Sequence, residues 1–151
     1  MDINELVKEL NKALADERLA YYQYWIGAKV AKGPLRGGVV AELEEHAAEE
    51  LKHAGKLAER ILQLGGTPLL SPEEWCRVTN CGYAVPDDFK TKKLLEQNIK
   101  GEQCAIEAYQ KLANLVKDVD HITYHLVLGI LEDEVKHEED LEALVEDMKM
   151  M

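Results

Sequence analysis

The sequence predicts an all-α protein, a four-helix bundle in which one connection is much longer than the other two. Apolar residues recur at alternating spacings of three and four along four long segments, which is the pattern of an amphipathic helix. Only four prolines and one phenylalanine occur, which disfavours a fold of many β-strands. The connection between the second and third segments has 24 residues, whereas the other two have only a few.

The first predicted helix covers residues 2–32, where Asp2 and Glu5 form a capping signature at its start and a Gly-Pro pair ends it. The second covers residues 35–64 and stops at a pair of glycines. The third begins after residues 86–88, and continues to about residue 117. The fourth begins near Asp120 and reaches the C-terminus. Each has roughly 28 to 30 residues and is therefore about 43 Å long.

The long crossover, residues 65–88, determines the topology. Crossing a bundle of this length needs at least ~13 extended residues, so the crossover can run from end to end and make the third helix parallel to the second. The short connections make their neighbours antiparallel, which gives the order up-down-down-up. Within the crossover, Ser71-Pro72-Glu73-Glu74-Trp75 predicts a short helix that ends near residues 80–82.

The length of 151 residues fits a single domain, residues 1–151. A formal charge of −11 disfavours binding to nucleic acid or anionic lipid and suits cation handling, although acidity also serves solubility. No apolar run approaches the ~20 residues of a membrane helix. Residues 1–5 lack a signal-peptide pattern, so we expect a cytoplasmic protein. The three cysteines form no CxxC pair, which excludes a zinc ribbon or a rubredoxin-type site.

A glutamate interrupts the apolar seam near the middle of each helix. Burying four unpaired carboxylates is costly, so they must be protonated, paired or bound to metal. Glu50 and Glu134 are each followed three residues later by a histidine, His53 and His137, on the same helix face. These two pairs are 84 residues apart and the other two seam glutamates 85, which indicates an internal near-repeat. Each of the four glutamates is about 15 to 17 residues from the short connection that joins its helix to the antiparallel neighbour. We therefore expect all four to lie at one height in the bundle.

Two lone glutamates and two E-x-x-H pairs are the ligand set of di-iron bundles. A single E-x-x-H is more often a solvated helix face, but here two agree in register. We therefore predict that two metal ions per subunit are bound by Glu17, Glu50, His53, Glu102, Glu134 and His137. Carboxylate and imidazole ligands suit Fe, Mn or Zn, so the sequence leaves the metal open.

Three further residues lie near the predicted ligands. Tyr24 and Tyr109 each follow a seam glutamate by seven residues. They are catalytic candidates that hydrogen-bond to ligand carboxylates or lend electrons, or else plain core aromatics. His46 lies one turn before Glu50 and is an accessory ligand, a residue of an access path or, more simply, an ordinary polar residue.

These motifs resemble the ferritin superfamily over nearly the whole chain, and within it the Dps-like ferritins of archaea and anaerobic bacteria, called thioferritins. The stretches that carry the closer likeness are Gly101-Glu102-Gln103-Cys104-Ala105-Ile106, Asn80-Cys81 before Tyr83 and Pro86, Thr123-Tyr124, and Glu134-Val135-Lys136-His137-Glu138. The resemblance implies a dodecameric cage with a bacterioferritin-type di-iron centre. Peroxide or O₂ would oxidise Fe²⁺ there, and ferric mineral would be stored inside, which protects against oxidative stress.

The resemblance also implies a cysteine pair beside the centre, which we predict to be Cys81 and Cys104 acting in redox chemistry. Cys104 lies about 200° around its helix from Glu102, so it faces outward rather than toward the metal. The alternative is two reduced, semi-buried thiols, and Cys76 matches no motif.

Departures from the family pattern sharpen these expectations. The haem-binding methionine of bacterioferritins is replaced by Leu51, so we predict no haem. The chain has neither a Lys-rich tail nor a fifth helix, so we expect no DNA binding and a 12-subunit rather than a 24-subunit cage. The alternatives are a rubrerythrin-like or manganese-catalase-like enzyme that removes peroxide without storage, and a structural bundle whose seam carboxylates bind zinc or pair with histidine.

Overall fold

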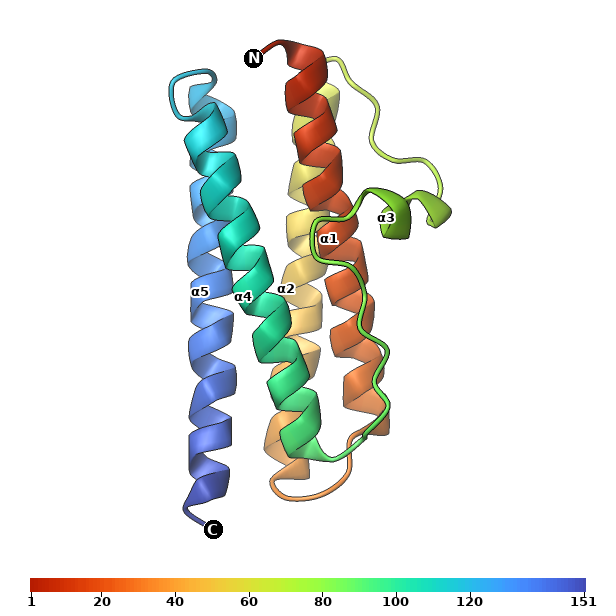
Figure 1. Cartoon of the computed structure of the whole chain (residues 1–151), viewed down its shortest axis with the longest axis vertical. Coiled ribbons are helices and arrows are strands. Elements are labelled where there is room, and N and C mark those ends of the chain that lie inside the picture. The colour runs from red at the N-terminus through yellow and green to blue at the C-terminus, as the bar shows by residue number, and fades with distance from the viewer.

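The structure, a computed structural model, describes all 151 residues and contains helices but no strands. The helices are α1 (Ile3–Val30), α2 (Arg36–Gln63), α3 (Glu73–Val78), α4 (Thr91–Val116) and α5 (His121–Lys149). Figure 1 shows that the four long helices form the bundle and that α3 lies outside it. The predicted four-helix bundle is confirmed, and the ends of its helices lie within one or two residues of the predicted ones. No helix combines the length and the apolar character needed to cross a membrane.

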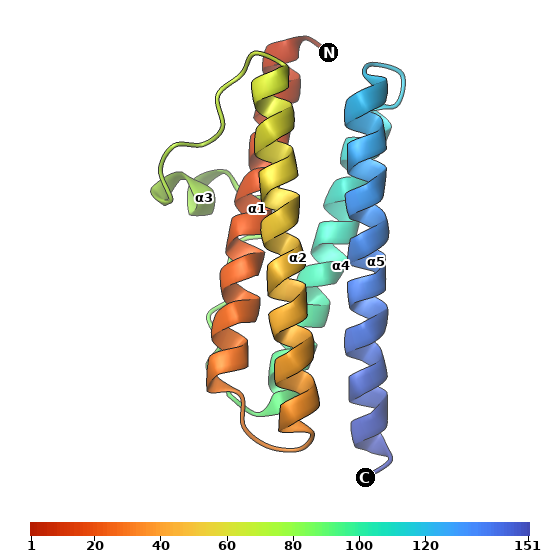
Figure 2. The same ribbon diagram turned by 180° about the vertical axis from the view of Figure 1, so that it is seen from behind.

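The crossover fixes the direction of the second pair of helices. It runs from one end of the bundle to the other, so that α4 is parallel to α2 and antiparallel to α5 (Figures 1 and 2). Its last residues pair with the loop between α1 and α2: the N–H of Lys32 donates to the carbonyl of Phe89 (2.9 Å) and the N–H of Thr91 to that of Lys32 (2.8 Å). The predicted up-down-down-up order is confirmed.

Helix ends follow the local signals in the sequence. The Asp2 side chain accepts a hydrogen bond from the N–H three residues later (2.8 Å), and Asp120 caps α5 in the same way. Past the end of α2, Gly65 has a φ of +83°, which favours glycine. A Cβ on Gly66 would lie only 2.7 Å from the methyl groups of Val7, so this close approach of the crossover to α1 requires glycine as well.

The apolar core is divided into two clusters. The larger packs the N-terminal half of α1 against α2, α4 and α5, and the smaller lies toward the other end of the bundle. Between them lie four glutamates that are at most 2% exposed: Glu17, Glu50, Glu102 and Glu134. The apolar clusters therefore enclose a polar layer at mid-height in the bundle.

Candidate metal centre

All six predicted ligands meet inside the bundle. They form two overlapping groups of four whose candidate ligand atoms lie within 4.8 Å of one another: Glu17, Glu50, His53 and Glu134 in the first, and Glu50, Glu102, Glu134 and His137 in the second. Glu50 and Glu134 belong to both groups. The two groups could therefore hold two metal ions, and Glu50 and Glu134 would be available to both.

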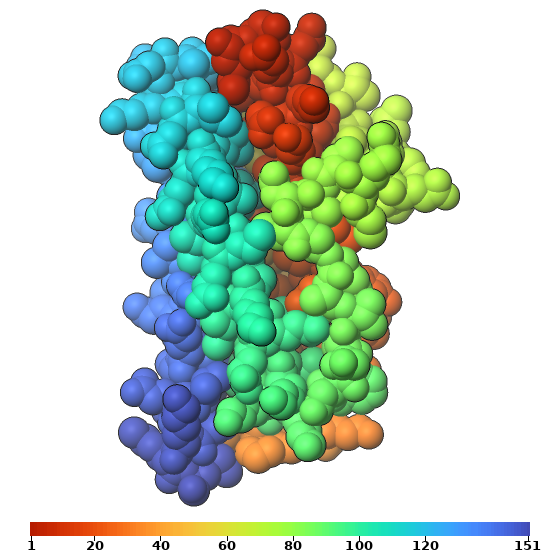
Figure 3. All heavy atoms as spheres, in the orientation of Figure 1, coloured from red at the N-terminus to blue at the C-terminus, as the bar shows by residue number.

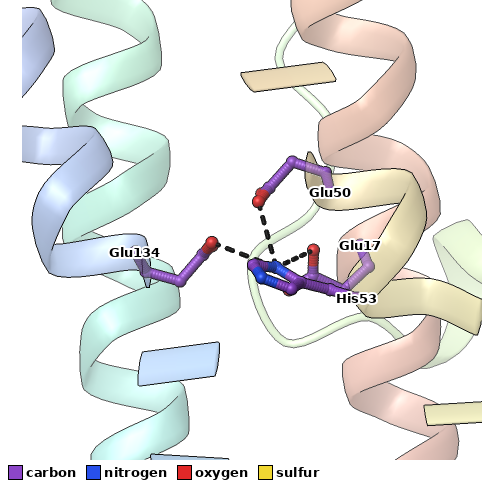
Figure 4. Close-up of side chains that lie close together, drawn as sticks. All are labelled: Glu17, Glu50, His53 and Glu134. Carbon is purple, nitrogen blue, oxygen red and sulfur yellow. Dashed lines mark ion pairs between the residues drawn. The ribbon is translucent and has the colours of Figure 1, made fainter. Parts of the chain in front are cut away.

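In the first group, three carboxylates converge on one ring nitrogen (Figure 4). Nδ1 of His53 lies 3.3 Å from Oε1 of Glu50. It lies 3.4 Å from Oε2 of Glu17 and 3.4 Å from Oε1 of Glu134. These side chains come from α1, α2 and α5, so the group is assembled only when the bundle is folded.

The second group repeats this plan. Nδ1 of His137 lies 3.4 Å from Oε1 of Glu50 and 3.4 Å from Oε1 of Glu134. Oε1 of Glu102, on α4, is 3.7 Å away. The internal near-repeat of the sequence thus becomes an approximate symmetry of the site, in which each half contributes one lone glutamate and one E-x-x-H pair.

Each of the six side chains has at least one buried oxygen or nitrogen atom without a hydrogen-bond partner. In a protein interior such atoms are normally satisfied, and leaving one unpaired costs about 1–3 kcal/mol. Bonds to a divalent cation would satisfy them, and a set of carboxylate oxygens and imidazole nitrogens suits Fe, Mn or Zn. The residues present therefore fit a di-metal centre.

Without cations, the site holds protons. Burial and the neighbouring charge of Glu134 raise the pKa of Glu17 to about 7 and the pKa of Glu102 to about 8. Burial lowers the pKa of His53, but the carboxylates of Glu134 and Glu17, each 3.4 Å from its Nδ1, outweigh burial and raise that pKa to about 10. The pKa of His137 rises to about 11 for the same reasons, with Glu102 and Glu134 as its partners. A cation entering the site must displace these protons.

The two candidate tyrosines hydrogen-bond across the bundle. The hydroxyl of Tyr24 on α1 donates to Oε1 of Glu102 on α4 (2.7 Å). The hydroxyl of Tyr109 on α4 donates to Oε1 of Glu17 on α1 (2.6 Å). In each glutamate the other oxygen, Oε2, is left without a partner. Each tyrosine therefore fixes one oxygen of a carboxylate and leaves the second free as a ligand atom.

Comparison with known proteins agrees with this site. The family model of the ferritin-like domain matches residues 7–151. The chain belongs to the ferritin family. It is 33% identical over 147 residues to the DNA protection during starvation protein of Pyrococcus furiosus, which covers 96% of this chain and 79% of that one. It is 32% identical over 134 residues to a bacterioferritin of Desulfovibrio desulfuricans, covering 88% of this chain and 70% of that one.

Among solved structures, the chain is similar to a dodecameric thioferritin, the bacterioferritin-related protein from Bacteroides fragilis. The TM-score is 0.97 and the sequence identity is 43%, over 100% of this chain and 90% of that chain. The resemblance to thioferritins read from the sequence motifs is thus confirmed.

Two residues beside the candidate centre, Glu49 and Asp133, were not predicted from the sequence. Oδ2 of Asp133 lies 2.8 Å from Nε2 of His53, and Oε2 of Glu49 contacts Nε2 of His137. Each acid directly precedes a candidate ligand glutamate and contacts the candidate ligand histidine on the other helix of the pair α2 and α5. An Nε2–H that donates to a carboxylate leaves Nδ1 free to bind metal. The signal that could have found them is the 84-residue offset, which relates Glu49 to Asp133 as well.

His46 lies beside the centre of this ferritin rather than in it. It is buried, and its ring stacks on that of His137 with 4.0 Å between the ring centroids. Its Nε2 contacts Glu42 at 3.0 Å. His46 belongs to neither four-residue group, but it forms a third group of potential ligand atoms with Glu42 and Asp140, within 4.8 Å of one another.

The predicted cysteine pair is bonded. Cys81 of the crossover and Cys104 of α4 form a disulfide, and their Cα atoms are 5.9 Å apart. Cys76 is free and exposed. The disulfide lines a cavity of about 200 Å³ that also reaches Glu17, Glu50, Glu102 and Glu134. Figure 3 shows the hollow between α4 and the crossover on this face.

Proposed function

We propose that this protein is a ferroxidase and iron-storage protein. It binds Fe²⁺ at the candidate centre, where peroxide or O₂ oxidises it, and it stores the ferric product inside an oligomeric cage, which limits oxidative stress. The observation that carries the proposal is the pair of buried four-residue groups that share Glu50 and Glu134 in a ferritin-family bundle. Glu17 and His53 would complete the site for one ion, and Glu102 and His137 would complete the site for the other.

Two adjacent Fe²⁺ ions suit this chemistry because each gives up one electron, and one molecule of H₂O₂ takes up two electrons and two protons to form two molecules of water. Four carboxylates offset the added positive charge of the ferric product. Tyr24 and Tyr109 hold Glu102 and Glu17 in place and are further candidates to supply electrons. Glu49 orients a ligand histidine.

The decisive experiment combines the mass of the purified particle with its metal content and its rate of Fe²⁺ oxidation. We expect a large hollow particle that contains iron and oxidises Fe²⁺ rapidly. Twelve subunits are expected because the similar protein from Bacteroides fragilis is dodecameric. A small oligomer that contains manganese and consumes peroxide without storing iron would support the alternative enzyme. A zinc-containing bundle without oxidation activity would support a structural role.

The protein is not expected to bind duplex DNA appreciably at ~0.15 M salt. Contacts to phosphates require clustered Lys and Arg, whereas each chain has a formal charge of −11, and assembly multiplies this charge. Several relatives are, in contrast, named DNA protection during starvation proteins. A gel-shift titration should show free DNA throughout. Tight binding that weakens with added salt would contradict the prediction.

The variant Cys104→Ser should bind Fe²⁺ normally but remove peroxide more slowly when the supply of electrons is a thiol. Closing the disulfide releases two electrons and two protons, which reduce one H₂O₂ to two molecules of water. Peroxide consumption in the presence of a dithiol measures this reaction. Cys76→Ser is the matched control, because that thiol is free and exposed. Equal rates in both variants and the wild type would refute the redox role, as would three free thiols after peroxide treatment.

A further inference from the structure

A single carboxylate on α1 holds the part of the crossover that contains Cys81. Asp16 is 8% exposed, and its carboxylate accepts hydrogen bonds from three consecutive crossover residues. The donors are the Thr79 hydroxyl, the Asn80 N–H (2.8 Å), the Asn80 side-chain amide (2.7 Å) and the Cys81 N–H (3.0 Å). Hydrogen bonds to an ionised carboxylate are roughly twice as strong as those between neutral groups. This contact therefore holds the segment firmly against α1.

The same segment turns sharply at the cysteine. Oγ1 of Thr79 accepts hydrogen bonds from the N–H of Cys81 (3.2 Å) and the N–H of Gly82 (3.0 Å). Gly82 has a φ of +74°. The hydroxyl of Thr79 thus links Asp16 to this turn, in which Cys81 meets Cys104 of α4.

Two other side chains of helix α1 hydrogen-bond to the crossover, and neither of them binds the cysteine. Near the start of the crossover, Nδ2 of Asn11 donates to the carbonyl of Thr67 (3.1 Å), and Oδ1 of Asn11 accepts from the N–H of Leu69 (3.0 Å). Gln23 accepts from the N–H of Ala84 (3.2 Å). Of these three side chains of α1, only Asp16 accepts a hydrogen bond from Cys81 itself.

A disulfide closes more readily when its two thiols are held close together, because their effective concentration is then high. Cys104 is fixed by α4, whereas Cys81 lies in irregular chain between α3 and α4. Without an anchor, the segment that carries Cys81 could sample many positions once the disulfide is reduced. The position of the reduced Cys81 thiol then depends on the contacts of its own backbone.

We propose that Asp16 is a positioning residue for the Cys81–Cys104 pair. Its carboxylate keeps the reduced Cys81 thiol facing Cys104, which raises the equilibrium constant for closing the disulfide. This inference deepens the thiol part of the proposed function and rests on it for its biological role, but the positioning itself can be measured without iron.

The test equilibrates the full-length assembled protein with mixtures of reduced and oxidised glutathione. As the bond between Cys81 and Cys104 forms, their two thiols pass two electrons and two protons to oxidised glutathione, which becomes two reduced molecules. Alkylation and mass spectrometry give the closed fraction. Asp16→Ala should lower the equilibrium constant for closing about tenfold or more, since it removes several charge-assisted hydrogen bonds. Thr79→Ala should lower it by less.

Asn11→Ala is the matched control, because it removes an anchor of the same crossover far from the cysteine. It should leave the equilibrium constant unchanged. The proposal is overturned if Asp16→Ala, with wild-type helicity and particle mass, keeps the wild-type constant, or if Asn11→Ala lowers it equally. If Asp16→Ala does not fold, the equilibrium constant is measured for Thr79→Ala instead, because this variant removes a hydrogen bond to Asp16 and changes only the crossover. A wild-type constant for Thr79→Ala then overturns the proposal. Since no iron is present, failure of the proposed ferroxidase activity would be detected separately in the oxidation assay.

Discussion

Replacing Glu50 and Glu134 together by alanine is expected to abolish rapid oxidation of Fe²⁺. Both carboxylates belong to both four-residue groups, so the double variant loses shared ligands at both metal positions at once. Even second-layer partners of metal ligands typically change affinity or activity about 10–100-fold, and the loss here should exceed that range. Ferric absorbance after mixing the protein with Fe²⁺ and peroxide measures the rate.

A matched control separates loss of the site from a general effect of charge. Glu59→Ala with Glu132→Ala removes one exposed carboxylate from each of the same helices, α2 and α5, and should keep the wild-type rate. The double variant at the site should remain folded, because it removes two of the four carboxylates that are buried close together in the metal-free protein. An assembled Glu50→Ala, Glu134→Ala particle with a near wild-type rate would refute the assignment.

The positions of the candidate ligand side chains could be predicted because they depend on helix geometry and on the lengths of the connections. The spacing between Glu50 and His53 places both on one face of a helix. The number of residues between each seam glutamate and the nearest turn sets its height, which is why Glu17 and Glu102 lie level with the two pairs. The length of the crossover then decides which helices run in parallel.

Contacts between helices could not be predicted in the same way. Helical periodicity relates Tyr24 to Glu17 on its own helix, but the Tyr24 hydroxyl binds Glu102 of another helix. Such a partner depends on how far each helix is rotated about its axis. Asp16 was missed for a related reason: its partners at residues 79–81 lie in irregular chain that has no period to read.

The metal-free protein, prepared with a chelator, is expected to lose stability as the pH rises from about 5 to about 9. The pKa of Glu17 rises from 4.5 to about 7 on folding, and the pKa of Glu102 from 4.5 to about 8. The pKa values of His53 and His137 rise from 6.5 to about 10 and about 11. In every case the folded state keeps a proton that the unfolded chain releases earlier, so this stabilisation is complete below the unfolded pKa and is lost as the pH rises through the folded one.

The size of the effect follows from the number of extra protons. Each proton that only the folded state holds lowers the free energy of unfolding by about 1.4 kcal/mol per pH unit. Glu134 acts in the opposite sense: burial opposes its ionisation, but hydrogen bonds from His137 and His53 lower its pKa below 4.5. Its stabilisation is present above pH 4.5 and is lost only at more acidic pH, outside the window considered.

Divalent cations should reverse this trend, because they replace the protons of the site and bind only the folded state. The increase in melting temperature on adding Zn²⁺, or Fe²⁺ without oxygen, should therefore be larger at pH 8 than at pH 6, in proportion to the protons displaced. Thermal unfolding with chelator and with metal at both pH values measures it. The Glu50→Ala, Glu134→Ala variant should lose most of the metal-dependent increase, whereas Glu59→Ala with Glu132→Ala should retain it. A metal-free melting temperature that stays constant or rises between these pH values would show that the buried cluster does not hold the protons assigned to it.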